Sequence, residues 1–226
     1  MAAIINAVKD GRLKNVEPVL VISSNPEAGG IEKAINLGIP KEDVVVIRRK
    51  DFSSPEEFGK KIIEECKKRN VEFVGQYGWL CLTPGNVIEE YKNKITNQHP
   101  GPLDPGRPDF GGHGMYGRRV HATRLEFVKK TNHDFWTEAT VHRVTAEYDK
   151  GKILNIIRVP IQENDDVDSL QERVLQKEYE AQIQTLQDFA DGTEKEIVRD
   201  EPLVRPEEFE ILEQCKIQAI KTYPKG

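Results

Sequence analysis

An amide, an imidazole and a carboxylate stand where a fold could bring them together. Asn97 and His99 lie in the segment 96–102, which follows a short apolar run, and Asp149 comes 50 residues after His99 (149 − 99). Asn97 can donate through its amide, and His99 can donate as an imidazolium and then release a proton. Asp149 can orient that ring and favour its charged form. Such a set can stabilise a tetrahedral oxyanion and move a proton.

Each of these residues also has an ordinary structural interpretation. A lone histidine is more often structural than catalytic, Asn97 could cap a turn, and Asp149 with Gly151 could form a simple turn between strands. We prefer the catalytic interpretation because Asn97 and His99 sit two residues apart at a predicted strand end. A second predicted strand, 137–144, leads toward Asp149, and its His142 is either a further donor or a packed strand residue.

The first half of the chain alternates predicted strands and helices. Strands are expected at 17–23, at 43–47, from Val71 and around Ile95, and helices at 27–37, from Ser54 and at 83–91. This alternation predicts a parallel, doubly wound sheet with right-handed crossovers. The apolar run 43–47 is expected to be buried on both faces. Ligands bind such sheets beyond the carboxyl ends of the strands, where Asn97 and His99 stand.

The second half has a different pattern. Residues 101–117 are rich in Gly and Pro and predict a long ordered loop, which beside a site is usually functional. After it we expect helices at 115–130 and 167–190 and strands at 137–144 and 153–159. Residues 196–226 predict one more strand and a helix over 206–222. The expected organisation is a domain of residues 1–195 with a C-terminal extension of residues 196–226.

Composition excludes several classes of function. With 37% hydrophobic and 31% charged residues and a net charge of −5, the chain is expected to be globular and not to bind nucleic acid. No apolar run approaches the roughly 20 residues that span a bilayer, and no signal peptide is evident. Cys66, Cys81 and Cys215 are widely spaced, so no disulfide framework is predicted. We therefore expect a cytoplasmic protein without a membrane partner.

A metal site is not expected. His113, His121 and His133 share no spacing typical of metal ligands, and no cysteine stands near them.

Several segments resemble the folate-dependent formyltransferase family. Residues 4–11 are similar to its first helix, 22–40 to its second strand, helix and turn, and 168–178 to its final helix. Asn97-x-His99-Pro100 and Asp149-x-Gly151 match its catalytic positions. The resemblance covers residues 2–195 and implies an α/β fold with a Rossmann-like, mostly parallel sheet flanked by helices.

The chain also departs from the family pattern. It opens inside the helix that follows the family's first strand and glycine-rich loop, and that loop holds the substrate phosphate at a helix N-terminus. We therefore expect an N-terminally truncated version of the fold, with two unpaired strand edges and lowered stability. Residues 101–106 differ from the family's Ser-Leu-Leu-Pro run. Both differences leave the acceptor open.

The resemblance, which favours the purine-biosynthesis branch of the family, implies a reaction. A formyl group would pass from 10-formyltetrahydrofolate, as co-substrate, to the primary amine of glycinamide ribonucleotide, without a metal. Asn97, His99 and Asp149 are the implied catalytic residues. The implied folate-binding residues are Leu80, Cys81, Leu82, Val144, Thr145 and Glu147. The implied acceptor-side residues are Pro100, Gly101, Lys177 and Glu178.

Three alternatives remain open at this point. A 10-formyltetrahydrofolate hydrolase or a sugar N-formyltransferase would share the three catalytic residues and differ in the acceptor pocket. A degenerate, non-catalytic formyltransferase-like protein would bind folate without turnover. In each case the partners are small molecules, and the protein could form a homodimer.

Overall fold

A computed structural model describes all 226 residues of the chain. The helices are α1 (Ala2–Lys9), α2 (Gly29–Asn36), α3 (Pro55–Lys67), α4 (Gly85–Glu90), α5 (Arg118–Thr131), α6 (Val167–Asp191) and α7 (Phe209–Thr222). The strands are β1 (Val21–Ser23), β2 (Val44–Val46), β3 (Val74–Gly75), β4 (Ile95–His99), β5 (Trp136–Arg143) and β6 (Ile153–Pro160). Short 3-10 turns cover Lys41–Asp43, Arg49–Asp51 and Pro206–Glu208.

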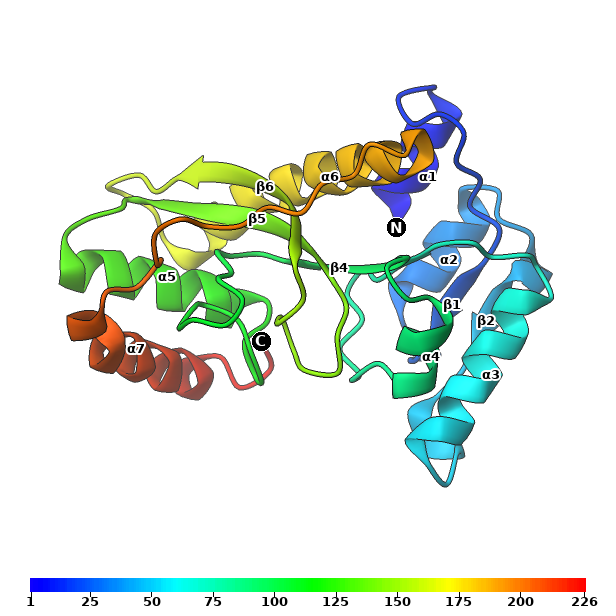
Figure 1. The fold of residues 1–226 in the computed structure, drawn as a ribbon, viewed down its shortest axis with the longest axis horizontal. Helices are drawn as coiled ribbons and strands as arrows, with labels where there is room; N and C mark the ends of the chain where they lie inside the picture. Colours follow the sequence, from blue (N-terminus) through cyan, green and yellow to red (C-terminus); the bar gives the residue numbers. More distant parts are fainter.

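The strands form two sheets. β1 pairs in parallel with β2, and a second sheet has the order β3-β4-β5-β6, in which β3 and β4 are parallel and the last two pairs are antiparallel. In Figure 1, α6 runs along β5 and β6, and α5 lies between α7 and the N-terminal end of α6. This confirms the predicted α/β fold with helices flanking the sheets, in which the strand pairs of the first half of the chain are parallel.

β1, β2, β3 and β6 each have a single hydrogen-bonded neighbour, so the two sheets are not joined to each other. The prediction that residues 43–47 are buried on both faces is wrong. β2 is partly exposed, and the side chain of Val46 is 41% exposed. The reason is that β2 has only β1 beside it in a two-stranded sheet, so the neighbouring helices cannot enclose it.

A core beneath the start of β4 fixes where that strand lies. Ile95 packs with Phe58, Ile62 and Cys66 of α3, and all four are buried. α3 begins as the sequence predicted, because the Ser54 hydroxyl caps it by accepting from the Glu57 amide at 3.1 Å. The anchored strand then carries Asn97 and His99 out of this core.

Helix α6 connects the two halves of the molecule. Its N-terminal half buries Leu170 and Val174 against β5 and β6, and its C-terminal half places Leu186 against Ile4 and Ala7 of α1. Its 25 residues stay amphipathic, and no helix of the protein has the length and apolar character needed to cross a membrane. The helix therefore joins the four-stranded sheet to α1.

The strand predicted after residue 196 is absent. Only one bridge forms, between Ile197 and Ile153. The chain then leaves the sheet because the Arg199 guanidinium binds the buried Glu138 carboxylate and donates to the Leu103 carbonyl at 2.7 Å. The predicted C-terminal helix is present as α7, and it packs on α5.

Gly151 should be essential to the turn that carries Asp149. A Cβ at this position would lie 1.6 Å from the Arg143 carbonyl oxygen, which is backbone of β5 and cannot yield. We expect Gly151→Ala to lower the free energy of unfolding by about 1–3 kcal/mol through overpacking, measured by urea denaturation. Gly85→Ala, which meets open space, is the control and should change stability by well under this amount. Equal effects from both variants would contradict the prediction.

Candidate active site

Strands β4 and β5 bring three polar side chains to one face of the sheet. Asn97 and His99 are two residues apart on β4, so they point the same way. Asn97 is paired in register with His142 of β5, and His99 with Thr140. His142, for which the sequence allowed two roles, therefore lies beside the predicted catalytic residues.

Asp149 completes this group from the loop between β5 and β6. Its backbone has φ +57°, a left-handed conformation that Asp tolerates better than most residues. Its Oδ2 accepts from the Gly112 amide at 2.9 Å and lies 3.6 Å from His99 Nδ1. Its Oδ1 lies 3.4 Å from His142 Nε2. One carboxylate thus faces two imidazole rings and one backbone N–H.

Both ring nitrogens of His99 face acceptors. Nδ1 faces Asp149, and Nε2 lies 3.2 Å from the Phe110 carbonyl oxygen. Burial, which leaves the residue 2% exposed, nevertheless lowers the pKa of His99 below its ordinary value, against the opposing pull of Asp149. Burial therefore favours the neutral ring in the unliganded protein, and the Asp149 carboxylate is the nearby group that most favours the imidazolium expected in the reaction.

Asp149 stays ionised although it is 9% exposed. Burial works to raise the pKa of its carboxyl, but the neighbouring His99 and His142 and the Gly112 N–H outweigh it and lower the pKa to about 2. The site therefore holds a fixed negative charge next to two imidazole rings.

Two pockets adjoin at Asn97 and Gln76, which line both. One of them contains five of the six predicted folate-binding residues together with Asp149 and His142. Those five are Cys81, Leu82, Val144, Thr145 and Glu147. Leu80 is the exception, since it is 62% exposed and outside the lining.

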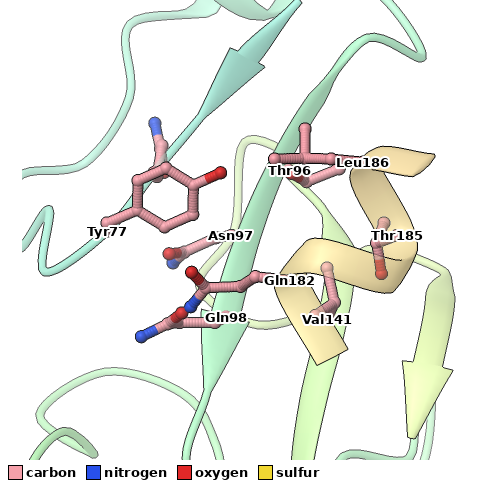
Figure 2. Close-up of a pocket in the computed structure, with 9 residues that line it drawn as sticks. Tyr77, Thr96, Asn97, Gln98, Val141, Gln182, Thr185 and Leu186 are labelled. Carbon is pink, nitrogen blue, oxygen red and sulfur yellow. The ribbon is translucent and has the colours of Figure 1, made fainter. Parts of the chain in front are cut away.

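The second pocket lies between β4 and α6. Figure 2 shows Asn97 and Gln98 from β4 and Gln182 from α6 reaching into the same space, with Tyr77 opposite. The Oε1 atoms of Gln98 and Gln182 are buried and have no hydrogen-bond partner. Sequence reasoning missed both glutamines, and the single available signal was the place of Gln98 between Asn97 and His99.

The four predicted acceptor-side residues lie in different surroundings, and none lines either pocket. Glu178 is buried on α6, one turn before Gln182, and burial raises the pKa of its carboxyl to about 7. Lys177 instead binds Glu180 at 2.8 Å on the outer side of α6. Gly101 is buried and accepts from the Thr140 hydroxyl at 2.9 Å, and Pro100 is half-buried beside it.

Comparison with known proteins identifies the family of this chain. The family described as "Formyl transferase" matches residues 1–186. "Phosphoribosylglycinamide formyltransferase, chloroplastic" of Arabidopsis thaliana is 32% identical over 174 residues, which are 76% of this chain and 55% of that protein. "Trifunctional purine biosynthetic protein adenosine-3" of Drosophila melanogaster is 30% identical over 85% of this chain and 13% of its own length. The chain spans about half the length of the plant relatives it matches.

Solved structures agree with this assignment. Glycinamide ribonucleotide transformylase 1 from Symbiobacterium toebii has a TM-score of 0.72 and 27% identity, over 84% of this chain and 82% of that chain. Phosphoribosylglycinamide formyltransferase from Brucella melitensis has a TM-score of 0.69 and 30% identity, over 87% and 92%. The chain belongs to the formyl transferase family.

Proposed function

We propose that this protein transfers a formyl group from 10-formyltetrahydrofolate to the primary amine of glycinamide ribonucleotide, a step of purine biosynthesis. The observation that carries the proposal is the meeting of two pockets at Asn97, beside an ionised Asp149 flanked by His99 and His142. A transfer reaction needs two substrates to approach one set of polar groups from two sides. The names of the relatives supply the acceptor, and the resemblance to the folate-dependent formyltransferases implies the donor.

The proposed chemistry uses the three predicted catalytic residues. The amine nitrogen attacks the formyl carbon, a C–N bond forms, and the formyl oxygen becomes an oxyanion. Asn97 donates its amide N–H to this oxyanion. His99, which is neutral in the unliganded protein and protonated in the complex with both substrates, donates as an imidazolium that Asp149 stabilises. The formyl oxygen replaces the Phe110 carbonyl as the partner of His99 Nε2. The amine proton passes to a water held by Asp149, the bond to the folate nitrogen then breaks, and that water returns the proton to the folate nitrogen.

The two substrates occupy separate sides of Asn97. The folate occupies the pocket of Cys81, Leu82 and the loop 144–149, where backbone groups can read the edge of a pterin. The amine approaches from the side of Gln98 and Gln182, whose buried acceptor atoms suit the N–H and O–H groups of a polar acceptor. The cytoplasmic location, the homodimer and the division at residue 195 stay predictions.

The test is an assay of the full chain with 10-formyltetrahydrofolate and glycinamide ribonucleotide. We expect the formylated nucleotide to form, with release of free formate slower by at least about tenfold when the amine is omitted. Formate release at the same rate without an amine would show a hydrolase, and faster turnover of an amino sugar would show a sugar formyltransferase. Tight folate binding with no product would show a binding protein.

Removing the oxyanion donors should stop the chemistry without stopping folate binding. We expect Asn97→Ala to lower kcat by about 10²–10³-fold and His99→Ala by about 10²–10⁴-fold, while the Kd of a folate analogue changes little. Asn36→Ala, at an exposed end of α2, is the matched control. Turnover of either site variant within about tenfold of the wild type would refute its assigned role.

Removing the charge of Asp149 should lower the pKa of His99 further. Burial lowers the pKa of His99, and the Asp149 carboxylate is the main group that raises it. Asp149→Asn therefore removes the charge that favours the protonated ring. Titration of the histidine ring signals by NMR measures this shift. Asp10→Asn, at an exposed position distant from His99 in the sequence, is the control and should leave the His99 signals unmoved. A rise in the His99 pKa would contradict the expected coupling.

Glu178 should make stability depend on pH. Its pKa is raised from 4.5 to about 7, so its favourable contribution is complete below 4.5 and is lost as the pH rises through 7. We therefore expect Glu178→Gln to match the wild type near pH 4.5 and to be more stable near pH 8, by about 3 kcal/mol at most. Urea denaturation at both pH values measures this, with the neighbouring exposed Glu180→Gln as control. A constant difference across pH would exclude titration of Glu178 as the cause.

A further inference from the structure

One peptide group joins the C-terminal helix to the candidate active site. Its N–H, from Gly112, donates to Asp149 Oδ2 at 2.9 Å. Its C=O, from Gly111, accepts from Lys216 Nζ of α7 at 3.4 Å. The two contacts lie at opposite ends of the same planar unit. A cation on α7 and the carboxylate beside His99 are thus linked through one backbone amide.

We propose that Lys216 is a positioning residue for formyl transfer, which acts on Asp149 through the Gly111–Gly112 peptide. This inference rests on the proposed function. A cation at the carbonyl end of a peptide polarises it and strengthens its N–H as a donor. An N–H bound to an ionised carboxylate is also stronger than a neutral pair. Lys216 therefore holds Asp149 in the orientation in which it faces both rings.

The local geometry leaves this peptide little freedom. A Cβ at Gly111 would lie 2.5 Å from Leu103 Cδ2 and 2.9 Å from Asp149 Cβ, so only glycine fits. Gly112 has φ +99°, which glycine adopts without strain. The preceding peptide is also held, because the Gly111 amide donates to Asp109 Oδ1 at 2.8 Å. In the Gly111–Gly112 peptide itself, Asp149 contacts the N–H and Lys216 supplies the one contact to the carbonyl.

Helix α7 is well anchored for this task. Leu212 and Cys215 are buried with Phe127 of α5 and with Phe110, whose carbonyl faces His99. The Lys216 side chain is 16% exposed, and its second partner is the exposed Glu213 at 3.6 Å. Helix α7 lies outside the residues 1–186 that match the family. A segment outside the matched residues thus reaches the site.

The chain end is fastened to the same loop. The Arg119 guanidinium donates to the Gly114 carbonyl at 2.8 Å and to the carbonyls of Tyr223 and Pro224 at 2.8 and 2.7 Å. The loop and the end of α7 therefore share one support. This arrangement keeps the distance between α7 and Gly111 fixed, as a positioning role for Lys216 requires.

The first measurement is kinetic. Lys216→Met keeps the aliphatic stem and removes the ammonium, and we expect kcat to fall about tenfold, the size of a lost charged hydrogen bond. KM for both substrates should stay within about twofold, because no substrate pocket is lined by Lys216. Lys216→Arg should recover most of kcat. Lys221→Met, at an exposed position of the same helix, should leave kcat unchanged.

The second measurement does not depend on activity. The Gly112 amide proton should move upfield in the NMR spectrum of Lys216→Met and exchange faster with solvent, with no such change in Lys221→Met. If this shift occurs in a protein without formyl transfer, the contact stands and the proposed function fails. An unmoved Gly112 signal overturns the inference, as does a kcat within about twofold of the wild type in an active enzyme. Should Lys216→Met fail to fold, Lys216→Gln is measured in its place, with the same outcomes.

Discussion

The structure around the candidate site depends on keeping one carboxylate ionised away from water. An unpaired buried charge is very costly, so Asp149 must be compensated by nearby groups. β4 and β5 supply the two imidazole rings, and the loop 101–117 supplies the Gly112 N–H. The turn that carries Asp149 closes against β5 only because residue 151 is a glycine. Sheet register, loop path and turn composition therefore all serve the same local electrostatic requirement.

The imidazole rings of His99 and His142 differ in the mobility of the carbonyl that each second ring nitrogen faces. The second nitrogen of His99 faces the Phe110 carbonyl, and that of His142 faces the Arg143 carbonyl at 2.9 Å. The Arg143 carbonyl belongs to a paired strand, so it cannot easily move. The Phe110 carbonyl belongs to a loop, so His99 is the ring that can exchange its partner for a substrate oxygen. This difference favours His99 over His142 as the group that meets the oxyanion, although His142 lines the pocket.

Much of the fold and part of the site could be predicted from the sequence. Strand ends are local features, so Asn97 and His99 could be placed together, and the turn residues around Asp149 marked the third position. The burial of β2 was predicted wrongly because it depends on how many strands lie beside it. The burial of His99, which lowers its pKa, could not be predicted because local sequence carries no information on burial. The contacts of Gly112 and Lys216 were missed because they join segments 37 and 105 residues apart.

Two unpaired polar atoms in the second pocket explain why a transferase would favour an amine over water. Gln98 and Gln182 each leave a buried carbonyl oxygen without a donor, and an unmet buried acceptor costs about 1–3 kcal/mol. A bound amine substrate with several N–H and O–H groups can satisfy both oxygens and stay oriented toward Asn97. A single water can donate to these two oxygens. It lacks the further groups of an amine substrate, so the pocket does not hold it at the distance and angle needed to attack the formyl carbon. Within the proposed function, discrimination against hydrolysis therefore arises from the pocket wall on α6 and β4, and the catalytic residues themselves need not distinguish the two nucleophiles.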